Sequence, residues 1–243
     1  MPRYSLSDPA VLAFFIIPIL LVTALMWATA EAWQRSGAAR PTVVRAAAVA
    51  GLAAIVWMAI TWAAASSGIF LEWDRTPPPF GVLVFLIVVV SAAIAFSAFG
   101  SRIARYVPLW SLVAVQAFRL PLELAMHGMY TRGIMPVQMS YSGLNFDIVT
   151  GITAVIVAAL VATGRGGKAL VATWNVLGLM LLINVVIVAI LGTPRFRFFG
   201  DEQLNTWVFY PPFVWLPAVM VLAALAGHLL IFRALSASRL TQV

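Results

Sequence analysis

The chain has 243 residues, of which 63% are hydrophobic and 9% charged, and its formal net charge is +7. A water-soluble domain of this size would leave far too much apolar surface exposed, so the composition predicts an integral membrane protein. The basic residues are spread singly rather than grouped in a patch, which argues against a nucleic acid partner. The sequence has no cysteine, which excludes disulfides, thiolate catalysis and cysteine-ligated metals.

Seven apolar stretches are each long enough to cross a bilayer as a helix, which takes about 20 residues. We therefore predict an all-α bundle of seven transmembrane helices, forming a single domain over residues 1–243. The predicted spans are residues 10–30, 42–65, 80–98, 107–130, 147–164, 169–192 and 211–235. The first span is longer than the apolar region of a signal peptide and is followed by arginines, so we expect it to be retained.

Basic residues predict the orientation of these spans. Nine of the fifteen follow spans one, three and five or lie in the tail: Arg35, Arg40, Arg45, Arg102, Arg105, Arg165, Lys168, Arg233 and Arg239. The other side holds fewer basic residues and six of the eight acidic ones: Arg3, Arg75, Arg132, Arg195 and Arg197, with Asp8, Glu72, Asp74, Asp147, Asp201 and Glu202. Because cytoplasmic loops are rich in lysine and arginine, we expect the amino terminus outside and the carboxyl terminus in the cytoplasm. The expected location is the cytoplasmic (inner) membrane of a cell.

The second span carries small residues at helical spacing. Ala46, Ala50 and Ala54 are four residues apart and lie on one face of the predicted helix. Small residues at such spacing let two membrane helices approach closely. We therefore expect this face to pack tightly against a neighbouring helix.

The fourth span differs from the others because polar residues lie inside it. Gln116, Arg119, Glu123 and His127 are offset by three, seven and eleven positions from the first. At about 100° per residue they fall within a wedge of roughly 80° on one helix face. Charged groups inside a span are expensive and usually face the protein interior or a water-filled cavity. We predict that this polar face is turned toward the interior of the bundle.

A proline interrupts the same span. Pro121 has no backbone N–H and its ring crowds the carbonyl of Ala117. We therefore expect the helix to kink here and to leave that carbonyl without its usual partner.

Two interpretations of the polar face remain open. In the first, Arg119 and Glu123 form a buried ion pair, hydrogen-bonded by Gln116 and Asn184, that only fixes how the helices pack. In the second, the same groups bind a ligand or relay protons, because ionisable residues inside a span commonly mark a pathway or a site.

The connections on the predicted outer side are long and polar, which favours a functional role. Residues 133–147 read GIMPVQMSYSGLNFD and end where the fifth span begins. Together with the polar face of the fourth span and one asparagine of the sixth, they predict an outward-facing polar pocket. The expected ligand-binding residues are Gln116, Arg119, Glu123, His127, Gln138, Tyr141, Asn145, Asp147 and Asn184.

Catalytic and cofactor chemistry is constrained by the same residues. Glu123, His127 and Asp147 are the candidate general acids or bases. Glu123 and His127 are one turn apart, but Asp147 is the only evident third ligand, so we predict no metal site. His228 falls near the cytoplasmic end of the last span, where an interfacial or hydrogen-bonded role is expected and where it cannot share a haem with His127. The only lysine, Lys168, lies in a turn, which excludes a retinal Schiff base, and we predict no cofactor.

Three classes of function remain open. We expect binding or transport of a small anionic or amphiphilic solute, or of protons. The alternatives are an accessory subunit whose outer loops contact a partner membrane protein, and a membrane-embedded enzyme that acts on a lipid-like substrate at the outer interface. A carrier needs a polar route toward the cytoplasm, for which Asn175 and His228 are the evident steps. An enzyme predicts a pocket that opens sideways to lipid.

Overall fold

The computed structural model describes residues 5 and 7–237, and this part of the chain is helical without strands. Within it, six helical segments are long and apolar enough to cross a membrane: α1 (Pro9–Arg35), α2 (Arg40–Ser66), α3 (Pro79–Phe96), the α5–α6 segment (Leu109–Thr131), α8 (Lys168–Leu191) and the η6–α9 segment (Leu216–Ala237). The predictions of an all-α fold and of an integral membrane protein are therefore supported. The predicted fifth span forms α7 (Ile148–Ala162), whose 15 residues are fewer than a usual span needs.

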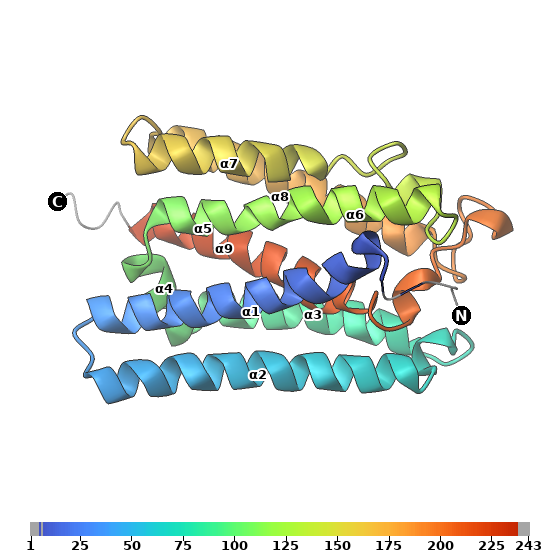
Figure 1. Cartoon of the computed structure of the whole chain (residues 1–243), viewed down its shortest axis with the longest axis horizontal. Helices are drawn as coiled ribbons and strands as arrows, with labels where there is room; N and C mark the ends of the chain where they lie inside the picture. Colours follow the sequence, from blue (N-terminus) through green and yellow to red (C-terminus); the bar gives the residue numbers. More distant parts are fainter. Residues whose placement is uncertain (1–4, 6, 238–243) are drawn as a thin grey trace.

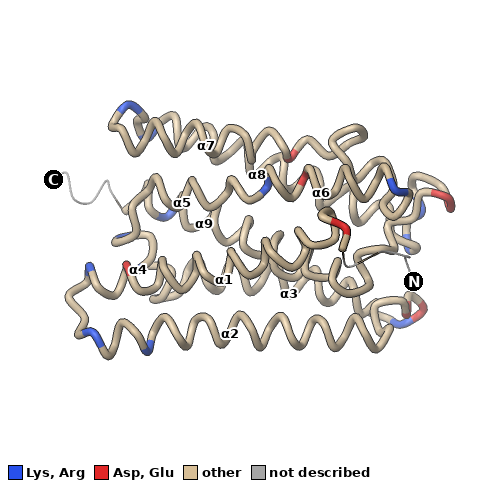
Figure 2. Tube along the Cα trace, viewed as in Figure 1, with Lys and Arg blue, Asp and Glu red and all other residues tan. Residues whose placement is uncertain are grey.

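The helices lie side by side, with α2 and α7 at opposite edges of the bundle (Figure 1). We call one end of the bundle the basic end; it contains residues 35–40, 97–108 and 163–167 and the end of α9. The other end, the acidic end, contains the connections 67–78, 132–147 and 192–215, and acidic residues gather mainly there (Figure 2). The two predicted sides are thus the two ends of the bundle, while the assignment of the basic end to the cytoplasm stays a prediction. Arg3 and Arg239 lie outside the described residues.

The α5–α6 and η6–α9 segments form the interior of the bundle. In each of these two segments, half of the residues in the most apolar stretch are buried inside the protein. In the corresponding stretch of α2, only 6% of the residues are buried. Most α2 side chains therefore face the surroundings, which for such an apolar helix means lipid. The polar face of the fourth span lies on one of the two central helices.

The fourth span is interrupted where its proline predicts. It consists of α5 (Leu109–Val115), a 3₁₀ turn η2 (Gln116–Phe118) and α6 (Arg119–Thr131). Pro121 lies in the first turn of α6, where its missing N–H costs least. The helix is thus irregular near the proline, as predicted, but the Ala117 oxygen accepts from the Arg119 N–H and is not left without a partner. Gln116 and Arg119 lie at the two ends of the tightened turn.

The last span begins with a π-helical turn, η6 (Leu216–Val221), which continues into α9 (Leu222–Ala237). Pro217 in this turn has no N–H to donate, and such insertions leave carbonyls outside the regular helix pattern. Neighbouring helices supply donors: Trp57 Nε1 lies 2.8 Å from the Ala218 oxygen, and Ser91 Oγ 3.2 Å from the Leu222 oxygen. The wide turn is therefore held by α2 and α3.

The connection between spans three and four is itself helical. It forms α4 (Ala98–Tyr106), whose first turn is capped by Ser97 accepting from the Gly100 N–H at 3.1 Å. A Cβ at Gly100 would lie 2.3 Å from the Ile94 oxygen, so glycine is required for the tight α3–α4 corner. Arg233 of α9 donates to the Ser97 oxygen at 2.9 Å and thereby fixes this corner to the interior of the bundle.

The acidic end is a folded cap rather than a set of free loops. It contains short helical turns η1 (Ile69–Leu71), η3 (Val137–Met139), η4 (Asp201–Gln203) and η5 (Trp207–Phe209). Trp207, Phe209 and Phe213 are buried, and Phe14 of α1 packs edge-on against Trp207 and Phe213, with ring centroids 5.6 and 5.1 Å away. The α8–α9 connection therefore closes this end of the bundle over the central helices.

The small residues of α2 do not all serve close packing. The tight contact with α1 is at Gly51, where a Cβ would lie 2.6 Å from Met26 Sδ. Ala46, Ala50 and Ala54 line a cavity instead and are only half-buried. The tight helix–helix contact that we expected at these alanines is therefore found at Gly51, while the alanines border the cavity.

Candidate functional site

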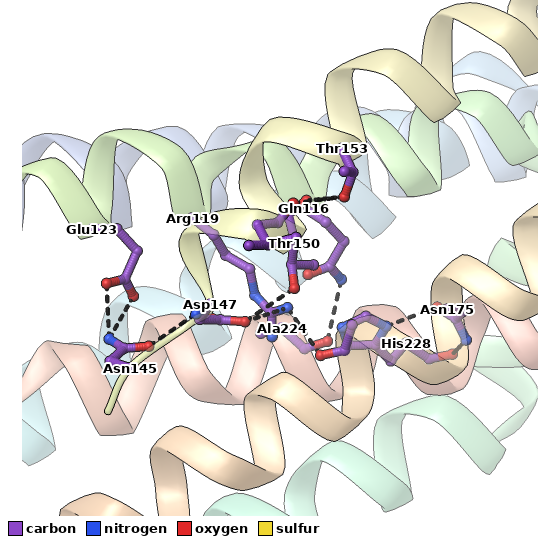
Figure 3. A network of polar contacts seen from close by, with 12 residues as sticks. Gln116, Arg119, Glu123, Asn145, Asp147, Thr150, Thr153, Asn175, Ala224 and His228 are labelled. Carbon is purple, nitrogen blue, oxygen red and sulfur yellow. Dashed lines mark hydrogen bonds and ion pairs between the residues drawn. The ribbon is translucent and has the colours of Figure 1, made fainter. Parts of the chain in front are cut away.

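A buried ion pair joins α6 to the start of α7. Arg119 Nη1 lies 3.1 Å from Asp147 Oδ1, and the two side chains are 1% and 5% exposed (Figure 3). The same Nη1 donates to the Gly178 oxygen of α8 at 3.3 Å, and Thr150 Oγ1 donates to Asp147 Oδ1 at 3.2 Å. Three helices thus meet at one guanidinium.

The second carboxylate of this cluster is held by an asparagine. Asn145 Nδ2 donates to both carboxylate oxygens of Glu123, at 2.9 and 2.8 Å, and to the Met139 oxygen at 3.0 Å. Asn145 Oδ1 accepts from the Asp147 N–H at 3.1 Å. Asn145 therefore ties the α6–α7 connection to Glu123 and also orients Asp147 toward Arg119.

The predicted ion pair between Arg119 and Glu123 is not formed. Arg119 pairs with Asp147, because Asn145 already occupies the Glu123 carboxylate and the guanidinium extends across to α7 and α8. The two residues that we expected to hydrogen-bond this pair bind other groups. Gln116 Nε2 donates to the Ala224 oxygen at 3.2 Å, and Asn184 Nδ2 donates to the Leu144 oxygen at 2.7 Å.

Two glycines allow this meeting of helices. A Cβ at Gly151 of α7 would lie 2.3 Å from the Leu120 nitrogen, so α7 packs directly on the backbone of α6. A Cβ at Gly178 of α8 would lie 2.8 Å from Cε1 of His228. Sequence reasoning missed both glycines, because a glycine inside an apolar span carries no sign of what it will contact.

A cavity of about 200 Å³ adjoins the ion pair, between α3, α6, α8 and η6. Arg119, Glu123 and Asp147 are part of its wall, and nearly all the rest of the wall is apolar. Three of its lining residues are about half exposed on the surface of the bundle: Val88, Ile183 and Ile187. The cavity therefore opens sideways between α3 and α8, toward lipid, rather than through the acidic end.

Two residues that line the cavity carry polar atoms without a hydrogen-bond partner in the described part of the chain, and most of these atoms are donors. Nε and Nη2 of Arg119 are buried and have no hydrogen-bond partner within the described residues, whereas Glu123 and Asp147 are both engaged. Asn205 also lines the cavity, and its Oδ1 is likewise without a partner there. Sequence reasoning missed Asn205, because it lies among several polar residues of one connection and no spacing distinguishes it from its neighbours. The site can hold a ligand that accepts hydrogen bonds.

Other predicted site residues lie apart from the cavity. His127 Nδ1 is 2.9 Å from Ser140 Oγ, and its ring is stacked on Tyr141 with centroids 4.3 Å apart. Gln138 Nε2 donates to the Gln203 oxygen at 2.7 Å and joins two connections of the acidic end. The predicted set therefore divides into a central group, Gln116, Arg119, Glu123, Asn145 and Asp147, and a peripheral group, His127, Gln138, Tyr141 and Asn184.

A second buried polar pair lies beside the cluster. His228 Nδ1 is 2.7 Å from Asn175 Oδ1, and Asn175 Nδ2 donates to the His228 oxygen at 3.0 Å. Both residues are fully buried, and His228 Nε2 has no partner within the described residues. Of the two roles expected for His228, the structure has the hydrogen-bonded one and not the interfacial one, because the ring packs inward beside Gly178.

Within the described ranges, no three His, Asp or Glu side chains are grouped so that they could hold a metal ion. No protein-family model matches the chain, and no curated protein or solved structure shows significant similarity to it. The geometry of the cluster and the cavity is therefore the basis for assigning a function.

Proposed function

We propose that this membrane protein binds an amphiphilic molecule taken sideways from the bilayer. The head group accepts hydrogen bonds from Arg119, and the apolar part lies in the opening between α3 and α8. The observation that carries this proposal is an otherwise apolar cavity whose wall includes Arg119, a residue with two buried guanidinium nitrogens that have no hydrogen-bond partner among the described residues. Leaving such donors unsatisfied costs about 1–3 kcal/mol each, which a ligand acceptor would recover.

The size of the cavity supports an amphiphile over a freely soluble solute. About 200 Å³ is less than the roughly 300–1,000 Å³ of typical small-molecule sites, so it accommodates a head group and the first few carbons. The remainder of the molecule then lies along Val88 and Ile187, which are half exposed. A strongly polar solute would find few partners on this wall, and burying its unpaired polar groups would be costly.

The charges favour an uncharged acceptor such as a carbonyl, ester or hydroxyl group. Two carboxylates, Glu123 and Asp147, stand beside one guanidinium, so an anionic head group would be repelled and would compete with Asp147 for Arg119. A neutral acceptor needs only Nε and Nη2 of Arg119 and leaves the ion pair intact. Neutral amphiphiles therefore fit this site better than the anionic solutes that the sequence also allows.

The test is native mass spectrometry of the gently extracted full chain and of Arg119→Lys. Lysine keeps the charge that Asp147 needs but lacks the planar set of donors. We expect a discrete extra mass on the wild-type protein that is lost in Arg119→Lys and kept in Arg132→Lys, an exposed arginine of the acidic end. Val186→Phe, which fills the cavity from α8, should also lose it. The proposal would be refuted if the wild-type protein and all the variants carried only bulk lipid and no discrete extra mass.

A second candidate function is proton transfer through the interior. Buried polar groups run from Glu123 through Asn145, Asp147 and Arg119 to the Gly178 carbonyl, beside which the buried His228–Asn175 pair lies (Figure 3). This series of buried polar groups includes Asn175 and His228, the two residues that a carrier would need on a route toward the basic end.

Proteoliposomes with a trapped pH-sensitive dye test this candidate under an imposed gradient. Proton flux above that of empty liposomes should be lost in His228→Phe and kept in His127→Phe, because His127 lies outside the chain of buried groups. Equal flux with and without protein would exclude proton transfer.

Catalysis by the carboxylates has less support. A general acid or base must be within hydrogen-bond reach of the substrate proton. Both oxygens of Glu123 already accept from Asn145, and Asp147 is engaged by Arg119 and Thr150. A substrate would have to displace these buried partners before either carboxylate could act.

A further inference from the structure

A second and larger cavity lies on the other side of α9. Its volume is about 860 Å³, within the range of sites for small molecules, and it is enclosed by α1, α2, α3, α4, α5 and α9. It does not include Arg119, Glu123 or Asp147, so it is a separate space from the site proposed above.

The cavity lies beside the part of α2 that contacts α1 but is not bonded to the last span. Near the acidic end, Trp57 Nε1 donates to the Ala218 oxygen at 2.8 Å and Trp215 Nε1 to the Met58 oxygen at 3.1 Å. Trp62 and Trp215 also pack there, with ring centroids 4.9 Å apart. Toward the basic end, α2 leans on α1, and its other face looks across open space to α9.

Small side chains keep this space open. Among larger apolar residues, the facing surfaces of α1, α2 and α9 carry eight alanines and one glycine, whose side chains are short: Ala24, Ala28, Ala46, Ala50, Ala53, Ala54, Ala223, Ala226 and Gly227. Protein interiors are normally filled to high density. An unfilled space of this size with a mostly apolar wall is therefore suited to an acyl chain from the surrounding lipid.

The cavity is deeper than one leaflet of hydrocarbon. On α2 it extends from Thr42 to Trp57, fifteen positions or about 22 Å along the helix axis. The hydrocarbon core of a bilayer is about 30 Å thick, so one leaflet occupies about half of it. The cavity is therefore deep enough for an acyl chain that enters from the leaflet of the basic end.

The mouth of the cavity is cationic. Arg45 and Thr42 line it, and Arg45 forms no ion pair or hydrogen bond with any described residue. Trp33 lines the same region, and the Arg102 guanidinium lies 4.4 Å above its ring. The acidic residue nearest in sequence, Glu31, already pairs with an arginine one turn away. An anionic group at this mouth would meet uncompensated positive charge.

We infer that this cavity binds one anionic phospholipid of the leaflet at the basic end. An acyl chain lies between α2 and α9, and the phosphate pairs with Arg45. Basic pockets between transmembrane helices are suited to such head groups. A further transmembrane helix is a poorer occupant, because it would cover the free Arg45 charge without an anion to balance it.

The test is to titrate the full-length protein with phosphatidylglycerol or with phosphatidylcholine of the same acyl chains. The amount of each lipid bound is then compared by native mass spectrometry. We expect the wild-type protein to prefer phosphatidylglycerol, and Arg45→Gln to weaken this preference about fivefold. Arg165→Gln, which removes an exposed charge of the basic end away from the cavity, should leave the preference unchanged. Equal binding of both lipids by the wild-type protein, or an equal effect of both substitutions, would overturn the inference.

A second measurement locates the chain and does not depend on the folding of any variant. A phosphatidylglycerol with a photoreactive acyl chain should label residues 46–54 of α2 and residues 223–227 of α9. Labelling spread evenly over the lipid-facing surfaces would refute the assignment, as would a stable dimer that buries this face. Ala50→Leu should reduce the labelling by filling the gap, and Leu52→Phe, on the exposed face of α2, should not.

Discussion

Replacement of Asn145 by alanine tests the architecture of the polar cluster most directly. The change removes the amide that holds both oxygens of Glu123, and it leaves that carboxylate buried at 2% exposure. Hydrogen bonds to a charged group contribute roughly 1.5–3 kcal/mol. The Met139 carbonyl and the Asp147 N–H lose a partner as well, at roughly 1 kcal/mol each. We therefore expect the free energy of unfolding to fall by about 3–5 kcal/mol.

The assay is unfolding in mixed micelles by increasing SDS, followed by tryptophan fluorescence. Asn184→Ala is the matched control, because its amide makes a single hydrogen bond, to the Leu144 oxygen, at a half-buried position. Its cost should be about 1 kcal/mol or less. If the two alanine variants lose the same stability, Asn145 does not hold Glu123, and the carboxylate is free to act at the cavity.

Three further outcomes are expected. Gly151→Ala forces a methyl group against the backbone of α6, and we expect it to lower the free energy of unfolding by about 1–3 kcal/mol or more. Gly81 has open space around it, so Gly81→Ala should be neutral or slightly stabilising in the same SDS assay. Asp147→Asn removes the ion-pair partner of the buried Arg119 guanidinium and should cost about 3–5 kcal/mol of unfolding free energy. In intact cells, an impermeant maleimide should label Glu202→Cys but not Gly167→Cys, since the native chain has no cysteine; the reverse pattern would invert the predicted orientation.

The sequence predicts the helical fold and the position of its polar centre because both depend on local patterns. Apolar length gives the spans, and the spacing of Gln116, Arg119 and Glu123 gives the face that turns inward. The break before Pro121 also follows from local chemistry, since proline removes one backbone donor.

The partners within the cluster could not be predicted in the same way. Helical periodicity says which face is buried, but it does not say which carboxylate reaches the guanidinium. That choice depends on the close approach at Gly151, which brings Asp147 to Arg119. Both cavities depend on the relative tilt of helices far apart in the sequence, which no local pattern records.

The wide turn at the start of the last span has a consequence for how the two cavities behave together. Consecutive residues of one helix face different cavities: Ala224 lines the smaller and Ala223 the larger. The wall between them is one helix thick, so a rotation of that helix that widens one space narrows the other. A π-helical turn contains one residue more per turn than an α-helix needs, and closing it rotates the helix beyond it by about 100°. Occupants of the two cavities that respond to this rotation would influence each other's affinity equally in both directions.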